Sequence, residues 1–447
     1  MTEAGLTTVV LPFFVHIRLL FTDHFYGMKK KPTPYLVCAD EKGQIFEEPE
    51  LLMLSRQGES FALPRPHELI PLPPSSDLFL LPGRKALGLD PDSGKIQVVD
   101  ALAVAGFASP GHTLSGTAAF MSEPDAPSLP LYAYGAVGYL DDRFWITACL
   151  VDKDQRQDFS HIQPTEITRN AQELLKKYPK NRLIKHLAGC ALNSCCPAAR
   201  NLALGRFEAP LPTSRSCNAR CIGCISLQPD DSGFQATQNR ISFTPKPEEI
   251  IQVMEVHCAR AKKPVLSFGQ GCEGEPLTQT DLICKAVSAV RDKIPQATIN
   301  INTNGSLPES ASKLARSGVN SVRVSLNSTD QDLYHSYYRP VNYIFDHVAW
   351  FIREAKKNNL FVSLNLLYFP GVTDTESQLE SLAEFIADLR IDFIQMRNLN
   401  LDPDVYLTLV RNKDLGPYTG LTNFMKRIKK QCPWVRFGYF NPYLDSG

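Results

Sequence analysis

From residue 208 onward, short apolar runs alternate with amphipathic segments of helical length. The apolar runs predict strands near residues 209–214, 264–269, 297–303, 321–327, 360–368 and 391–399. The amphipathic segments predict helices over residues 247–262, 277–293, 308–317, 346–358 and 375–389. Strands that alternate with helices form parallel sheets joined by right-handed crossovers. The pattern therefore predicts an α/β fold that contains a partial or complete (β/α)6 barrel of the TIM type.

The first 160 residues have a different texture, in which short β-prone runs are broken by Gly and Pro. Runs such as Tyr35–Ala39 and Phe144–Leu150 predict strands, and the turn signals Glu41–Gly43 and Pro91–Gly94 predict hairpins. The proline-rich stretch 63–82 predicts an extended surface connector. We expect residues 1–160 to form a β-rich N-terminal accessory domain ahead of the barrel.

The other predicted domain boundaries lie where the texture changes again. Residues 161–204 are expected to form a helical, cysteine-containing linker, in which Gln163–Tyr178 is a helix with Thr165 as its N-cap. Residues 205–400 are expected to form the barrel, and residues 401–447 a C-terminal extension of helix and strand.

Two of the predicted strands carry polar side chains at alternate positions, so that these side chains share one face. They are Asn300, Asn302 and Asn304 in one strand, and Ser321, Arg323, Ser325 and Asn327 in the next. A half-solvated antiparallel sheet also alternates in this way. The intervening helices, however, would cover the apolar face and leave the polar face inside a barrel. Because buried polar groups are costly unless they are bound, we expect a site inside the barrel.

Composition argues against several classes of partner unless a local charged patch binds them. The chain has 447 residues, with 47 basic and 47 acidic side chains, so no net charge attracts nucleic acid or an anionic membrane. The short basic run Lys426–Lys430 is more typical of a solvated helix face than of an RNA-binding stripe. No apolar run approaches the ~20 residues that span a bilayer. The stretch Val9–Phe21 is interrupted by polar residues and lacks a preceding basic region, so we expect no signal peptide and a cytoplasmic protein.

Twelve cysteines in a long chain without an export signal favour metal or redox chemistry over a disulfide framework. Cys217, Cys221 and Cys224 follow the first barrel strand with the spacing C-x3-C-x2-C. Three thiolates this close can hold three corners of an iron–sulfur cluster and leave one iron without a protein ligand. The alternatives are a zinc knuckle without its fourth ligand, or inert core cysteines. The position at the C-terminal end of a barrel strand favours the cluster.

This motif resembles the signature of the radical S-adenosylmethionine (radical SAM) superfamily. The resemblance implies a [4Fe–4S] cluster held by Cys217, Cys221 and Cys224, with SAM chelating the fourth iron. It further implies reductive cleavage of SAM to methionine and a 5′-deoxyadenosyl radical, which abstracts hydrogen from a substrate. A small electron donor of the flavodoxin or ferredoxin type is implied as the partner. One residue departs from the family pattern: the position before the third cysteine, usually aromatic, is Gly223.

Further segments resemble the superfamily over roughly residues 205–400. Gly274-Glu275-Pro276 resembles its Gly-Gly-Glu-Pro element, although Cys272 and Glu273 depart from the usual pattern. By this resemblance Glu275 would accept hydrogen bonds from the amino group of SAM. The complete set of SAM contacts that the resemblance implies is Gly274, Glu275, Asn304, Ser325, Asn327 and Arg339.

The members of this set differ in their expected roles. Asn304 belongs to an element that resembles the family's Thr-Asn-Gly, and Ser325 and Asn327 would contact the ribose or the carboxylate of SAM. Arg339 would neutralise that carboxylate, with a surface salt bridge as the alternative. The segment Pro370–Asp374 resembles members related to molybdenum-cofactor biosynthesis protein A.

The leading hypothesis is a radical SAM enzyme whose catalytic side chains and substrate are unknown. A peptide, in the manner of the maturases of this branch, a small metabolite or an RNA remain open as substrates, and local evidence for RNA is thin. Gln395 and Arg397 on the sixth strand are either substrate contacts or satisfied polar groups of the lumen. An iron–sulfur electron-transfer protein without SAM turnover is the alternative, and a zinc-dependent binding module is a third.

Cys190, Cys195 and Cys196 cluster upstream of the triplet and predict a second iron–sulfur cluster. A closed cluster normally needs four thiolates, so Cys272 or Cys432 would supply a further ligand. Neighbouring residues 195 and 196 point different ways if the backbone is extended, so we expect only one of them to bind. The alternative is that these cysteines are buried small hydrophobes.

Overall fold

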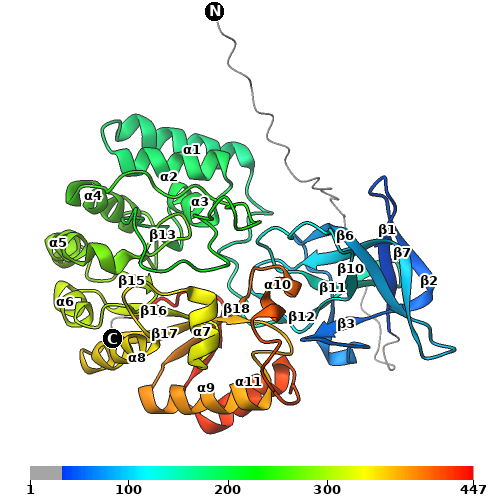
Figure 1. The fold of residues 1–447 in the computed structure, drawn as a ribbon. Coiled ribbons are helices and arrows are strands. Elements are labelled where there is room, and N and C mark those ends of the chain that lie inside the picture. Colours follow the sequence, from blue (N-terminus) through cyan, green and yellow to red (C-terminus); the bar gives the residue numbers. More distant parts are fainter. Residues whose placement is uncertain (1–32, 446–447) are drawn as a thin grey trace, which may run out of the picture.

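The computed structural model describes residues 33–445. Figure 1 shows two parts that lie beside each other, a β-rich part coloured blue to cyan and an α/β part coloured green to red. The expectation drawn from Val9–Phe21 falls outside the described residues. Within residues 33–445, no helix has both the length and the apolar character that a membrane crossing requires.

A seven-stranded parallel sheet forms the centre of the α/β part, and its strands follow one another in chain order. The strands are β13 Glu208–Pro210, β14 Val265–Phe268, β15 Thr298–Thr303, β16 Ser321–Leu326, β17 Phe361–Tyr368, β18 Phe393–Asn398 and β19 Arg436–Gly438. The α/β class and the partial barrel predicted from the sequence are confirmed. The seventh strand, β19, lies in the C-terminal extension that was expected to contain helix and strand, although no bounds were predicted for it.

Helices alternate with these strands as the amphipathic pattern predicted. They are α4 Pro247–Cys258, α5 Thr280–Val290, α6 Ser310–Ser317, α8 Phe345–Lys357 and α9 Glu376–Leu389, followed by α10 Pro403–Thr408 and α11 Leu421–Gln431. A further helix, α7 Gln331–Tyr338, was not predicted from the pattern. Asp330 begins α7 by accepting a hydrogen bond from the backbone N–H of Leu333.

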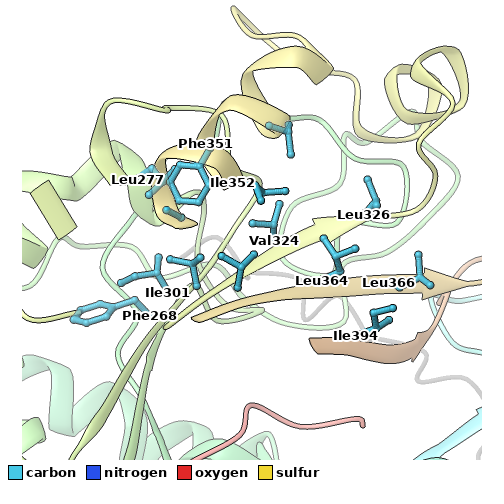
Figure 2. Packing of buried hydrophobic residues seen from close by; sticks show 14 of the residues in the cluster. Phe268, Leu277, Ile301, Val324, Leu326, Phe351, Ile352, Leu364, Leu366 and Ile394 are labelled. Carbon is cyan, nitrogen blue, oxygen red and sulfur yellow. The ribbon is translucent and has the colours of Figure 1, made fainter. Parts of the chain in front are cut away.

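The two faces of the sheet have opposite character, as the alternation predicted. Val324, Leu364 and Ile394 lie opposite one another on β16, β17 and β18. Figure 2 shows them on the side where Phe351 and Ile352 of α8 pack, and all five are fully buried. The helices therefore cover the apolar face, and the polar residues point into the lumen.

Polar side chains of the lumen form a continuous hydrogen-bond network at its base. Asn441, which follows β19, donates to Glu208 at 2.7 Å and to Ser267 at 3.2 Å, and accepts from Gln395 at 2.8 Å. The Oε1 atom of Gln395 in turn accepts from Arg323 at 2.8 Å. Some of the polar side chains in the lumen thus form hydrogen bonds with one another, and these bonds offset the free-energy cost of burying them.

The N-terminal part is built from antiparallel strands. Within the described residues these are β1 Tyr35–Ala39, β2 Ile45–Met53, β3 Ser55–Gln57, β4 Ser60–Ala62, β5 Leu69–Pro71, β6 Asp77–Leu89, β7 Ile96–Phe107, β8 His112–Leu114, β9 Thr117–Ala118, β10 Phe120–Ser122, β11 Gly135–Leu140 and β12 Arg143–Leu150. The β-rich character predicted from the sequence is confirmed. The stretch 63–82 is not a surface connector, because β5 pairs with β12 and Leu69 and Leu72 are buried.

Three helices join the two parts: α1 Pro164–Lys177, α2 Arg182–Asn193 and α3 Pro197–Leu204. The prediction that Thr165 caps α1 is wrong, since the N-cap is Gln163. Pro164 takes the first helical position, where its missing N–H costs nothing and its fixed φ suits the helix.

The β-rich part docks at the C-terminal end of β18. Thr113 of β8 donates to the carbonyl of Met396 at 2.8 Å, and Leu114 N donates to the side chain of Asn398 at 2.8 Å. A buried ion pair joins Arg84 of β6 to Asp402, the N-cap of α10, at 2.7 Å. In Figure 1, α10 accordingly lies between the two parts.

Candidate functional site

The loop that carries the cysteine triplet follows β13 at the C-terminal edge of the sheet. Its backbone is held by the chain that ends α7. Ile222 N donates to the Tyr337 carbonyl at 3.0 Å, and Val341 N donates to the Asn218 carbonyl at 2.8 Å. An antiparallel bridge pairs Ala219 with Pro340. The loop is therefore fixed by hydrogen bonds on both sides of its second cysteine.

The three thiols of this loop lie close enough to influence one another electrostatically. Burial raises the pKa of Cys217 to about 11, with smaller contributions from the charges of Glu275 and Cys224. Burial also raises the pKa of Cys221, and the charges of Cys217 and Cys224 raise it further. Such thiols stay protonated unless a cation holds the thiolates, and soft thiolates suit iron–sulfur clusters.

A single metal ion and an iron–sulfur cluster place different demands on the arrangement of three thiolates. Among residues 33–445, no group of three or more His, Cys, Asp or Glu converges in a way that could hold one ion. Thiolates of an iron–sulfur cluster bind different iron atoms, so they need not converge on one point.

Glu273 joins the cysteine loop to the loop after β14. Its side chain is 5% exposed and accepts five hydrogen bonds. Oε2 accepts from the backbone N–H groups of Thr213 and Ser214 at 2.7 and 2.8 Å, and from the Thr213 hydroxyl at 3.2 Å. Oε1 accepts from Gly269 N and Gln270 N at 2.7 and 2.8 Å. Burial raises the pKa of Glu273 despite these backbone donors.

Gly274 packs directly against the peptide that precedes Cys217. A Cβ atom at position 274 would lie 1.9 Å from the Ser216 carbonyl oxygen, a distance that no substitution can relieve without moving the backbone. Glu275 N donates to the same carbonyl at 2.9 Å. Glycine is required here because the two loops approach backbone to backbone.

Glu275 lies beside the cysteine loop and is hydrogen-bonded to the protein through both carboxylate oxygens. Oε1 accepts from Leu277 N at 3.0 Å and from the Thr303 hydroxyl at 2.5 Å, and Oε2 accepts from Asn304 N at 2.8 Å. Burial raises the pKa of Glu275 to about 7, and these donors oppose the shift. Since a carboxylate oxygen has two lone pairs, Oε2 retains capacity for one further donor.

Asn304 also contacts the cysteine loop. Its Nδ2 donates to Asn218 Oδ1 at 2.8 Å, and Asn218 Nδ2 donates to the Ser306 hydroxyl at 2.8 Å. Asn304 therefore joins the loop after β15 to the cysteine loop after β13, as Glu273 joins the loop after β14 to it. The structure brings together Gly274, Glu275, Asn304 and the three cysteines.

The remaining residues of the predicted SAM set lie on or after β16. Ser325 is half-buried on the lumen face, opposite Asn365 of β17. Asn327 is buried, and its Oδ1 atom has no hydrogen-bond partner among the described residues. Arg339 is exposed, has a left-handed backbone with φ of 46°, and forms no ion pair within residues 33–445. The surface salt bridge that was the alternative for Arg339 is therefore not found there.

Tyr337 explains the unusual glycine before the third cysteine. A Cβ atom at Gly223 would lie 2.5 Å from the hydroxyl oxygen of Tyr337. Tyr337 is 4% exposed, and burial raises its pKa, with a further increase from the charge of Cys221. The side chain of Tyr337, on α7, therefore occupies the space that an aromatic residue at position 223 would need.

A cavity of about 1040 Å³ adjoins the cysteine loop and enters the lumen. Arg240 is on its lining and places its guanidinium 3.5 Å from the sulfur of Cys224. Arg397 lines the cavity, whereas Gln395 is fully buried and bonded to Arg323 and Asn441. Of the two residues on the sixth strand, Gln395 is a satisfied polar group of the lumen.

The upstream cysteines reach the same cavity in part. Cys190, Cys196 and Cys272 line it, and the charges of Cys190 and Cys196 contribute to the raised pKa of Cys272. Cys195 is exposed and does not line it. Cys432 is buried elsewhere, with its thiol 3.7 Å from the Ala383 carbonyl of α9, so it is excluded as a ligand of this group.

Sequence reasoning missed three residues of the site: Glu273, Asn218 and Tyr337. Glu273 was noted only as a departure from the family element. Asn218 lies between the first two cysteines, where an amide that can bond to a neighbouring loop was a usable signal. Tyr337 gave no signal, because its proximity to Gly223 depends on the path of α7.

Comparison with known proteins gives the following similarities. Residues 211–386 match the family described as the Radical SAM superfamily. A probable GTP 3′,8-cyclase of Methanocella arvoryzae is 30% identical over 189 residues, which cover 41% of this chain and 52% of that protein. GTP 3′,8-cyclase of Petrotoga mobilis is 29% identical over 203 residues, which cover 45% and 54%. The chain thus spans about half the length of the curated relatives it matches.

Similar solved structures have low identity. HydG, a maturase of the [FeFe]-hydrogenase, is 14% identical with a TM-score of 0.38, over 64% of this chain and 67% of that one. SuiB of Streptococcus suis, bound to the precursor peptide SuiA, is 13% identical with a TM-score of 0.38, over 54% and 53%.

Proposed function

We propose, on the premise that residues 211–386 are a radical SAM domain, that this chain is a radical SAM enzyme that uses a [4Fe–4S] cluster on Cys217, Cys221 and Cys224. When bound, the cluster and SAM supply one-electron cleavage of SAM and a 5′-deoxyadenosyl radical that abstracts hydrogen from the substrate. The observation that carries the proposal is the junction of loops around the triplet. Glu273 and Gly274 hold the loop after β14 against the cysteine loop, and this brings Glu275 beside the thiols.

The residues proposed to bind SAM have atoms left for a ligand. Glu275 Oε2 can accept one more donor, which suits the ammonium group of SAM. Asn327 Oδ1 is a buried acceptor without a partner among the described residues, and an unsatisfied buried acceptor is costly until something donates to it. Gly274 is included in the proposed SAM site because it packs against the cysteine loop.

The electron-transfer alternative is less well supported. A carrier of electrons needs a cluster near the surface but no chamber for a substrate. Here a cavity of about 1040 Å³ adjoins the cysteine loop, and a chamber of this size suits the binding of a second molecule. A reductant of the flavodoxin or ferredoxin type, a peptide or small-molecule substrate, and a cytoplasmic location belong to this proposal.

We also propose a second iron–sulfur cluster on Cys190, Cys196 and Cys272. The support is that these thiols come from α2, the start of α3 and the loop after β14, and line one cavity. His186, one turn before Cys190 on α2, has its Nε2 atom 3.6 Å from the Cys190 sulfur and is a suitable fourth donor. Cys195 is exposed and is not on the cavity lining, which supports a cluster that uses only one of the two adjacent cysteines.

The first experiment tests SAM cleavage. Protein reconstituted anaerobically with iron and sulfide and supplied with a reductant should convert SAM to 5′-deoxyadenosine. The variant with Cys217, Cys221 and Cys224 replaced by Ala should form none, whereas Cys284→Ala, a thiol on α5 away from this loop, should retain it. Formation of 5′-deoxyadenosine by the triple variant would overturn the assignment.

Iron content tests the second cluster. Two [4Fe–4S] clusters correspond to about eight irons per chain, and one cluster to about four. Replacing Cys190, Cys196 and Cys272 by Ala should remove about four irons and leave the triplet's cluster in place. A wild-type content of about four, unchanged in this variant, contradicts the second cluster but not the first.

A further inference from the structure

Two arginines of the lumen face the cavity without a carboxylate partner. Arg323 lies on β16 and Arg397 on β18, and both line the cavity. Within residues 33–445 neither forms an ion pair. Of the other lining cations, Arg182 pairs with Glu249 at 2.7 Å, Arg240 donates to the Ser226 hydroxyl at 3.2 Å, and Lys185 is exposed to solvent.

The donors of the two arginines are only partly used. Arg323 donates from Nη1 to Gln395 at 2.8 Å, and its Nε is buried with no partner among the described residues. Arg397 donates to the Tyr439 carbonyl at 3.3 Å and stacks on the Tyr439 ring at 4.0 Å. Stacking fixes the plane of the guanidinium and leaves other N–H groups free to bind.

The lining of the cavity carries more positive than negative charge. The charged residues of the lining are five cations and one carboxylate: Arg182, Lys185, Arg240, Arg323, Arg397 and Glu208. The single carboxylate is shared, because Glu208 lies 3.6 Å from Arg156 and accepts from Asn441. Burial, and after it the nearby charge of Arg397, lowers the pKa of Arg323 to about 10, and the charge of Glu208 opposes this shift.

We propose that Arg323 and Arg397 together bind an oxyanion, a carboxylate or phosphate group, of the substrate. The forked guanidinium donates two parallel hydrogen bonds to either group, which a lysine cannot do. An anion here would give the free Nε donor a partner and would remove the repulsion between the arginines. The inference rests on the proposed function and adds the substrate class: a molecule with an anionic group seated in the lumen.

The test uses oxyanion probes on the reconstituted full chain. Inorganic phosphate, pyrophosphate and succinate are titrated separately by calorimetry, with sodium chloride at matched ionic strength as the control. Saturable binding is expected for the phosphate probes or for succinate, and which of them binds identifies the group. Arg323→Gln and Arg397→Gln should each weaken that binding about tenfold or more. Arg353→Gln, an exposed arginine of α8 paired with Asp388, should bind as the wild type does.

Two further variants keep the test decisive if a glutamine variant does not fold. Arg323→Lys and Arg397→Lys retain the charge but not the fork, so they should bind the probe between the wild type and the glutamine variants. No binding above the chloride control in the wild type, or equal binding in Arg323→Gln and Arg397→Gln, overturns the proposal. A loss of iron from these variants without any oxyanion binding would instead assign the cations to the second cluster, and would also overturn it.

Failure of this inference is separable from failure of the proposed function. SAM cleavage by the wild type is measured without any probe, so its absence overturns the radical SAM assignment whichever anion binds. Oxyanion binding is measured without SAM, so its absence overturns only the substrate class.

Discussion

Replacing Glu273 by Gln tests whether one buried carboxylate holds together the two loops that we propose to bind the cofactors. The change keeps the size of the side chain and converts one carboxylate oxygen into an NH2 group that cannot accept. In either orientation of the amide, at least two backbone N–H donors then face another donor. The orientation that costs less places the NH2 toward Gly269 and Gln270, whose bonds are only partly buried.

The size of the effect follows from that count. A buried donor left without a partner costs about 1–3 kcal/mol, so two of them cost about 2–6 kcal/mol. Because the Gly269 and Gln270 side is partly accessible to water, we expect the lower half of this range. Burial raises the pKa of Glu273, so part of the carboxylate's own desolvation cost is relieved in the amide, which also favours the lower half.

The assay is a pair of measurements on the same preparations. Urea denaturation followed by circular dichroism should show a lower midpoint for Glu273→Gln. Anaerobic reconstitution should incorporate less iron, because the cysteine loop loses its link to the loop after β14. Glu309→Gln, an exposed glutamate at the start of α6, removes the same charge and should change neither quantity. An unchanged midpoint together with unchanged iron content would refute the reasoning.

Three other predictions concern single residues. Glu275→Gln should weaken SAM binding, measured by calorimetry, by about 2–5 kcal/mol while iron content changes less, and unchanged affinity would contradict the proposed role. Burial lowers the pKa of His257 from 6.5 to about 4, so the unfolded chain binds a proton in that window that the folded chain does not. The free energy of unfolding should therefore fall by about 3 kcal/mol through His257 as the pH falls from 6.5 to 4. His257→Gln can still donate to the Phe207 carbonyl and should lose less stability when denaturation is measured at the two pH values. Gly223→Ala should lower the stability of the wild type, and should lower that of Tyr337→Phe much less, because the hydroxyl that the new Cβ meets is then absent. Additive effects of the two substitutions in this double-mutant cycle would contradict the contact.

The elements of the α/β part were predictable because its helices and strands have different hydrophobic periods. Apolar residues repeat every two residues in strands such as β16 and about every 3.6 residues in the helices, so the pattern of each segment predicts its own secondary structure. The short strand β19 and the helix α7 escaped this reasoning. β19 has three residues, too few for a period, and α7 is recognisable mainly by Asp330 as its N-cap.

The candidate site was predictable only in its local part. The spacing of Cys217, Cys221 and Cys224 is visible along the chain, and so is the element that contains Glu275. Whether Cys272 approaches Cys190 depends on how α2 packs against the loop after β14, and no local pattern encodes that distance. The prediction of Cys432 as a ligand failed for the same reason, since Cys432 packs against α9.

Two of the departures from the family pattern, Glu273 and Gly223, have a common physical origin in how closely the loops approach one another. Glu273 replaces the expected residue because two loops meet there with four backbone N–H groups that need an acceptor. Gly223 replaces an aromatic residue because the hydroxyl of Tyr337 already occupies the space. In each case a residue that differs from the family motif fits a neighbouring residue that is distant in the chain. A departure inside a motif is therefore evidence against function only when the structure shows that no such neighbour compensates for it.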